Sequence, residues 1–88
     1  MWSRREMDAL VQATDKALRS LRSRIGNYKL EKLKVHRSEL RLIVIVWNAY
    51  EKRRVVVKYD GSNVWVEAPK HIAMPLKNKI IYFLQSQR

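Results

Sequence analysis

Three runs of β-branched and aromatic residues, separated by short polar breaks, occupy residues 41–67. The runs read RLIVIVW, RRVVVKY and VWVE, and Val, Ile, Tyr and Trp are residues that strands favour. Asp60-Gly61 lies in the second break, and this dipeptide tolerates the positive φ angles of a tight turn. The pattern therefore predicts a meander of three antiparallel strands.

The last two runs form a hairpin whose inner face does not depend on the length of its loop. A two-residue turn at Asp60-Gly61 and a four-residue loop over 60–63 place the same alternate residues on one face. The residues predicted to face the core are Val55, Val57, Tyr59, Val64 and Val66. The opposite face is predicted to carry Arg54, Val56, Lys58, Trp65 and Glu67.

Helical periodicity appears at both ends of the chain. Ser3 and Glu6 have the spacing of a capping box, and the apolar stripe that follows predicts a helix over 4–25 that ends at Gly26. A second stripe, with Pro75 at a favourable first position, predicts a helix over 75–86. The first stripe comprises Met7, Leu10, Val11, Thr14, Leu18, Leu21 and Ile25, and the second comprises Leu76, Ile80, Phe83 and Leu84.

These elements predict one α+β domain over residues 1–88. Residues 28–40 fit neither period, and we interpret them as a basic connector, partly helical or extended toward the first strand. The order is helix, connector, three-stranded antiparallel meander and helix (α-β-β-β-α), with both helices on one sheet face as two layers. The alternative is a winged helix, with residues 53–67 as the wing. It requires a helix over 41–48, which would be apolar on every side and difficult for so short a chain to bury.

Composition narrows the function. Nineteen Lys and Arg against eight acids give a net charge of +11, a balance typical of proteins that bind nucleic acid. His36 and His71 have no second metal ligand nearby, and two glycines cannot build a phosphate-binding loop. We therefore expect no enzyme, no metal and no cofactor.

Cellular location follows from what the chain lacks. It has no cysteine, no apolar run near the ~18 residues that span a bilayer, and no apolar leader after the N-terminus. We expect a cytoplasmic protein with no membrane partner.

Three basic surfaces are candidates for phosphate contacts with little sequence readout. The first runs from the end of the first helix into the connector: Arg19, Arg22, Arg24, Lys29, Lys32, Lys34 and Arg37. The second joins the strand-connecting loop to the outer face of the hairpin, where bases alternate with aromatic residues as on single-strand platforms: Tyr50, Lys52, Arg53, Arg54, Lys58 and Trp65. The third precedes and opens the last helix: Lys70, His71, Lys77 and Lys79.

The α-β-β-β-α order, with lysines at the start of the last helix, resembles the double-stranded RNA-binding domain. The resemblance implies that two helices cover one sheet face and that Lys70, Lys77 and Lys79 contact a duplex. A protein-interaction module is the alternative function. In that case an inhibitor, adaptor or assembly subunit would bind an acidic partner, or form a homodimer, through apolar residues of the outer sheet face: Ile43, Ile45, Val56 and Trp65.

Overall fold

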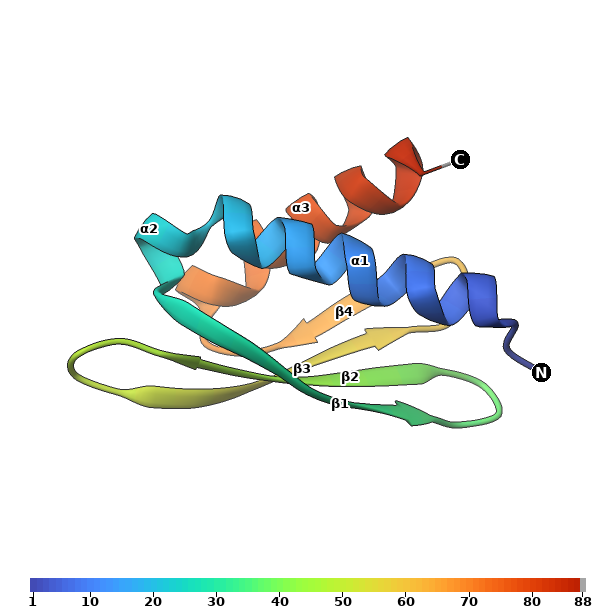
Figure 1. Cartoon of the computed structure of the whole chain (residues 1–88), viewed down its shortest axis with the longest axis horizontal. Coiled ribbons are helices and arrows are strands. Elements are labelled where there is room, and N and C mark those ends of the chain that lie inside the picture. The colour runs from blue at the N-terminus through green and yellow to red at the C-terminus, as the bar shows by residue number, and fades with distance from the viewer. Residues whose placement is uncertain (88) are drawn as a thin grey trace.

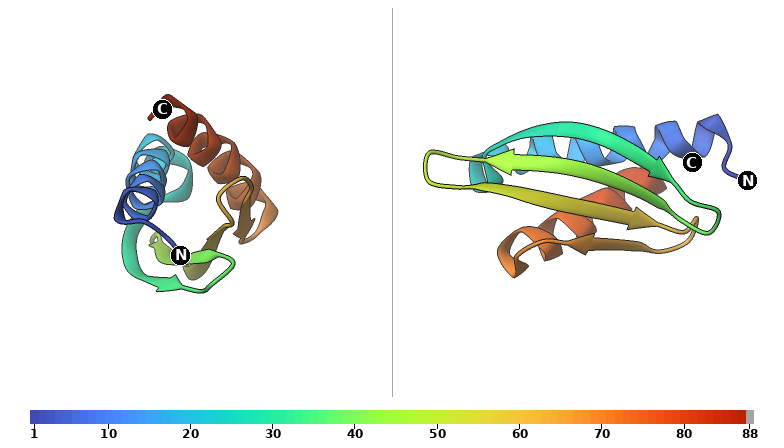
Figure 2. Two further views of the ribbon diagram at one scale, coloured as in Figure 1. Left: turned by 90° about the vertical axis from the view of Figure 1, so that its right-hand side faces the viewer. Right: turned by 90° about the horizontal axis from the view of Figure 1, so that it is seen from below.

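The computed structural model describes residues 1–87, and it is an α+β fold in two layers. The strands form one antiparallel sheet in the order β1-β2-β3-β4, and α1 and α3 pack against each other on the same side of it (Figures 1 and 2). The elements are α1 Arg4–Ser20, α2 Arg22–Ile25, β1 Asn27–Val35, β2 Leu40–Trp47, β3 Lys52–Tyr59, β4 Val64–Glu67 and α3 Lys70–Ser86.

The first helix begins as its capping box predicts. The Glu6 amide donates to Ser3 Oγ at 3.1 Å, and the Ser3 amide donates to Glu6 Oε1 at 3.0 Å. The single helix expected over 4–25 is wrong in one respect, because the backbone breaks at Leu21 into α1 and the one-turn α2. At the break, Ser20 Oγ donates to the Ala17 carbonyl at 2.8 Å, and such side-chain bonds compete with helical ones and bend helices.

The expected connector is instead a strand, so the sheet has four strands rather than three. Residues 28–35 of that segment belong to β1, which pairs antiparallel with β2, and the register shifts between Leu30 and Lys32. The extra residue, Glu31, is a β-bulge, which adds one position to the alternation of inward and outward side chains. The bulge explains why the segment fitted no single period. The side chains of β1 on the helix side are Tyr28, Leu30, Leu33 and Val35.

The region 40–47 is a strand, so the winged-helix alternative is wrong. It forms the second strand of the sheet, hydrogen-bonded to β1 on one edge and to β3 on the other. Its inward residues, Leu42 and Val44 among them, are fully or almost fully buried beneath the helices.

The loop between β3 and β4 is the four-residue version. Tyr59 pairs with Val64, and Asp60 Oδ1 accepts from the amides of Ser62 at 2.8 Å and Asn63 at 2.7 Å. An Asp side chain that satisfies the loop's own amides stabilises this turn. The predicted inner face of the hairpin is confirmed, with Val55, Val57 and Val64 buried.

Helix α3 starts five residues earlier than expected. The Pro69 carbonyl accepts from the amides of Ile72 at 2.9 Å and Ala73 at 2.8 Å, so the first turn forms before Pro75. Pro75 removes one helical bond, the one to the carbonyl of His71. His71 is exposed, so water can satisfy that carbonyl.

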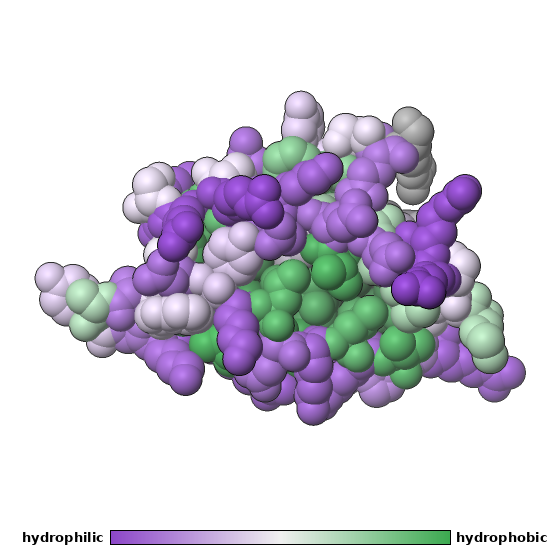
Figure 3. All heavy atoms as spheres, viewed as in Figure 1, coloured by the Kyte–Doolittle hydropathy of each residue, from purple (hydrophilic) through white to green (hydrophobic). Residues whose placement is uncertain are grey.

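The core lies between the helices and the sheet, and Trp2 covers one end of it. The Trp2 indole N–H donates to the His36 carbonyl at 2.9 Å, and its ring lies 6.0 Å from that of Tyr59. Apolar surface also remains visible between α1 and the free edge of β1 (Figure 3). Val11 of α1 and Leu33 of β1 are partly buried against the core, and Val35 of β1 is 54% exposed.

Candidate nucleic-acid interface

The helix-free face of the sheet is the most basic surface that the strands build. Seen from below, the four strands lie in front of both helices, so no helix covers this side (Figure 2). Strand alternation places fourteen side chains on it, which we call the outer face: Asn27, Lys29, Lys32, Lys34, Arg41, Ile43, Ile45, Trp47, Lys52, Arg54, Val56, Lys58, Trp65 and Glu67. Seven of these are bases and one is an acid, and the bulge residue Glu31 adds a second carboxylate, because it lines a hollow with Lys29 and Trp47.

The registers bring three bases into direct opposition across the sheet. Lys34 pairs with Arg41, and Arg41 pairs with Lys58. The same row continues to Trp65 on β4. Like charges directly opposite each other on one face destabilise a sheet, so this row opposes folding rather than supporting it.

Two carboxylates relieve part of this repulsion. Lys58 Nζ lies 3.1 Å from Glu67 Oε2, and Arg41 forms an ion pair with Glu39. The hydrogen bond from Arg41 lowers the pKa of Glu39 below its ordinary value. In the described part of the chain no carboxylate forms an ion pair with the other five bases of the outer face, which are Lys29, Lys32, Lys34, Lys52 and Arg54.

The centre of the outer face is apolar, but its apolar residues have little solvent-exposed surface. Ile43 is 2% exposed although no helix covers it, and Val56 and Ile45 are half-buried. The aliphatic stems of neighbouring long basic side chains can cover such residues while their charged ends remain in water. The exposed aromatic surface of this face belongs to Trp47, at 37%, and Trp65, at 46%.

The first predicted surface is divided between the two layers. Its three lysines lie on the outer face, whereas its helical arginines lie in α1 and α2 on the other side of the sheet. Arg19 forms an ion pair with Asp15 at 2.6 Å, and Arg22 donates to Asn27 Oδ1 at 3.0 Å. Arg37 lies in the turn between β1 and β2.

The second and third predicted surfaces are also rearranged. Lys52, Arg54, Lys58 and Trp65 share the outer face, but Arg53 has the opposite parity and is bonded to Glu51 at 3.0 Å. On the helix side Arg53 lines a small hollow with Arg24 and His71, while Lys79 lines a neighbouring hollow with Arg24. Lys77 lines a hollow with Lys58 and Trp65 at the β4 edge, and Lys70 is exposed at the start of α3.

Two residues of the outer face, Arg41 and Trp47, were missed as candidate binding residues from the sequence. Alternation along β2 from Leu40 was the available signal, because it places both residues on the face that Lys58 shares. The apolar character of the whole segment concealed that alternation.

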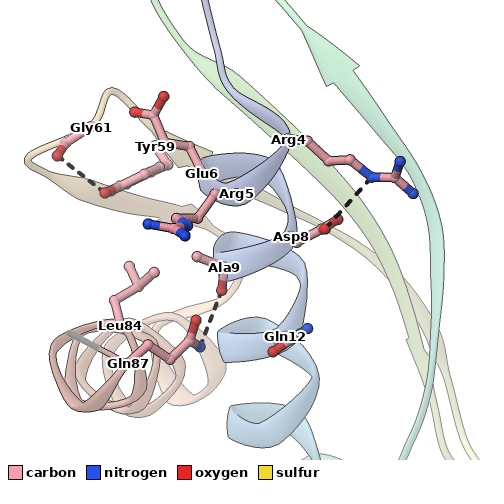
Figure 4. Close-up of a pocket in the computed structure, with 10 residues that line it drawn as sticks. All are labelled: Arg4, Arg5, Glu6, Asp8, Ala9, Gln12, Tyr59, Gly61, Leu84 and Gln87. Carbon is pink, nitrogen blue, oxygen red and sulfur yellow. Dashed lines mark hydrogen bonds and ion pairs between the residues drawn. The ribbon is translucent and has the colours of Figure 1, made fainter.

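A separate hollow lies between the start of α1, the end of α3 and the β3–β4 loop (Figure 4). Its polar groups are largely bonded to one another: Arg4 to Asp8 at 3.9 Å, Gln87 Nε2 to the Ala9 carbonyl at 3.4 Å, and the Tyr59 hydroxyl to the Gly61 carbonyl at 3.1 Å. Acids and bases alternate around it, so it lacks the excess of one sign that would hold a phosphate.

Within residues 1–87, no three His, Cys, Asp or Glu side chains come together in a way that could hold a metal ion. None of the helices described is long and apolar enough to cross a lipid bilayer. Comparison with protein-family models, with curated proteins and with solved structures finds no match to this chain.

Proposed function

We propose that this chain is a small non-enzymatic protein that binds nucleic acid through the outer face of its sheet. The excess of positive charge on this face carries the proposal: Glu39 and Glu67 pair with Arg41 and Lys58, and the other five bases have no ion-paired carboxylate among the described residues. Like charges that stay opposed weaken a sheet, and a polyanion would neutralise them. Proteins tolerate such local conflicts mainly at functional sites. Cytoplasmic nucleic acid is the partner that this proposal implies.

Binding through phosphates with little sequence readout fits the chemistry of the outer face. Five of its seven bases are lysines, which act as mobile point charges rather than as planar forks that read base edges. Each base that neutralises a phosphate releases counterions, so the affinity must fall as salt is added.

The test is a salt titration of oligonucleotide binding. If the five unpaired bases each contact one phosphate, the logarithmic slope is about −3.5, and affinity falls about 100-fold between ~50 and ~200 mM salt. A flat response over that range would remove the proposal.

Matched charge-removal variants locate the surface. Replacing Lys29, Lys32 and Lys34 together by Gln removes three charges from the outer face, and replacing Arg4, Arg5 and Lys16 by Gln removes three from α1. The first triple variant is expected to flatten the slope by about 2, and the second to leave it nearly unchanged. Equal losses would indicate a diffuse charge effect. Polyglutamate that competes as well as an oligonucleotide would instead favour an acidic protein partner.

Self-association is a second candidate, favoured by the apolar surface beside β1 rather than by the outer face. Two copies whose outer faces met would bring like charges together, whereas β1 is an edge strand that carries Leu33 and Val35, and apolar surface is visible between it and α1 (Figure 3). Antiparallel pairing of β1 with β1 in a two-fold dimer would cover this surface. Sedimentation tests it: Val35→Asp is expected to abolish a dimer that Trp65→Asp leaves intact, and the reverse result would place the contact on the outer face.

A further inference from the structure

The two exposed tryptophans of the outer face stand at opposite ends of the sheet. Trp47 is opposite Lys52 at the start of β3, and Trp65 is opposite Lys58 near its end. Six residues of a strand span about 20 Å, and β2 and β4 are about 10 Å apart across β3. The two indoles therefore mark a diagonal a little over 20 Å long, with basic side chains along both sides.

Neither tryptophan is used by the fold in the way that Trp2 is. Trp2 packs on Tyr59 and donates its indole N–H to a carbonyl, but within residues 1–87 neither Trp47 nor Trp65 has a protein acceptor or an aromatic partner. Large aromatic side chains left exposed on a small domain indicate a binding surface.

A duplex cannot use these side chains. Its base faces are stacked on one another, so an indole meets only phosphates and groove edges. Four strands at a spacing of ~4.8 Å make a face about 15 Å wide before side chains are added, wider than the ~12 Å major groove or the ~6 Å minor groove. The outer face can therefore touch only the rim of a duplex.

A single strand can use both kinds of side chain at once. Its bases are free to leave the stack and lie on an indole, while its phosphates follow the lysines, and stacking tolerates any base. The end of the face at Trp47 brings the two kinds of contact together, because Lys52, which has no ion-paired carboxylate among the described residues, is directly opposite that tryptophan.

We propose that the outer face binds single-stranded nucleic acid. One nucleobase stacks on Trp47 and another on Trp65, and the phosphates of the strand contact the Lys and Arg side chains of β1 and β3. This inference rests on the proposed function and narrows its ligand. It also separates the chain from the double-stranded RNA-binding domain, because the sheet has four strands where that resemblance implied three, and because the helices lie on the other side of the sheet from this face.

The experiment compares a labelled strand of about 12 nucleotides with the blunt duplex of the same sequence, as DNA and as RNA, by fluorescence anisotropy at low salt. The single strand of at least one sugar type is expected to bind at least tenfold more tightly than its duplex. Indole fluorescence should be quenched as the strand binds.

Substitutions isolate the stacking. Trp47→Ala and Trp65→Ala are each expected to weaken single-strand binding roughly 5-fold to 150-fold without changing the salt slope, because no charge is removed. Trp65→Leu keeps apolar bulk without a π face and is expected to weaken binding too, whereas Trp65→Phe retains most of it. Tyr82→Ala removes a 61% exposed aromatic from α3 and is expected to leave binding unchanged. Circular dichroism melts identify any variant that fails to fold.

The outcomes separate this inference from the proposed function. Duplex binding as tight as single-strand binding, or wild-type affinity in folded Ala and Leu variants, overturns the single-strand assignment and leaves the proposed function standing. Failure of every oligonucleotide to bind at low salt overturns both.

Discussion

Gly26, where α2 joins β1, is the backbone position at which a single methyl group should do the most damage. Its φ is +104° and its ψ is −156°, a region that is essentially restricted to glycine. A Cβ built there would lie 2.6 Å from the Trp47 carbonyl oxygen, which is backbone and cannot rotate away. Gly61 provides the matched control, because its φ is +100° but its Cβ would meet only the Trp2 ring at 3.8 Å.

The two glycines allow strain and clash to be separated. An alanine at positive φ costs about 1–2 kcal/mol through its conformation alone, and this is the expected loss for Gly61→Ala. Gly26→Ala adds a steric conflict worth about 1–3 kcal/mol more, for a total of about 2–5 kcal/mol. A domain of this size has a free energy of unfolding of about 4–13 kcal/mol, so Gly26→Ala removes a large part of it.

Thermal and urea unfolding, both followed by far-ultraviolet circular dichroism, measure both variants. Gly61→Ala is expected to lower the melting temperature by about 5–15 °C, and Gly26→Ala by at least twice as much or to prevent folding. The denaturant dependence of Gly61→Ala should match the wild type, because the surface exposed on unfolding is the same. Equal destabilisation by the two substitutions would refute the close approach of Gly26 to β2.

Three further predictions concern single side chains. Thr14 is fully buried and, in the described structure, its hydroxyl has no hydrogen-bond partner, so Thr14→Val should raise the free energy of unfolding by about 1 kcal/mol in urea; a loss of that size would indicate a hidden partner. Two backbone amides of its own loop lower the pKa of Asp60 below its usual 3.8, so its contribution to stability is present above that pH and is lost as the pH falls through the lowered pKa. Asp60→Asn should therefore flatten melting temperature against pH in acid, and an unchanged profile would contradict this. Trp2→Phe keeps the packing but removes the 2.9 Å bond to the His36 carbonyl, with an expected loss of about 1 kcal/mol in the same urea assay; no loss would show that the bond contributes nothing.

The elements that the sequence predicted correctly are those whose local signals and burial agree. The capping box of Ser3 and Glu6 marked the start of α1 to the residue. The inner face of the last hairpin was predicted correctly because a two-residue turn and a four-residue loop place the same alternate residues on that face. The length of the loop was not decided from the sequence. The interaction that decides it is the acceptance by the Asp60 side chain of hydrogen bonds from the Ser62 and Asn63 amides, and the spacing of residues does not predict that interaction.

The first strand was missed because one residue, Glu31, interrupts its period. Apolar and polar residues alternate through Leu30 and again from Leu33. Across Glu31 the alternation shifts by one residue, so the whole segment shows no single period. The start of α3 was misplaced for a different reason. Proline favours the first turn of a helix, so the sequence favoured a start at Pro75, but the helix begins at Lys70 and Pro75 lies beyond its first turn.

The failure to predict β1 affected the predicted binding surface more than any other part of the prediction. Without β1, the lysines at 29, 32 and 34 appeared to continue a helical arginine cluster, and the predicted outer face held the mixed side chains of the hairpin, among them Arg54, Lys58 and Trp65. Pairing β1 with β2 places those lysines on the same sheet face as Arg41 and Lys58, with Lys34 directly opposite Arg41, and separates them from the arginines of α1. Register, which depends on long-range pairing, decided the composition of the surface.

The placement of charge explains how so basic a chain can hold a fold at all. The core faces the helices, and its Leu, Ile and Val side chains supply the hydrophobic stabilisation independently of the outer face. Cross-strand repulsion on the outer face is then a local cost, reduced by Glu39 and Glu67 but not removed. A bound polyanion would relieve the remainder and stabilise the folded state, by about 2.7 kcal/mol at a ligand concentration of about 100 times Kd. Under the proposed function, stability and binding are coupled through one surface, because the repulsion that weakens the free sheet is what a bound polyanion would relieve.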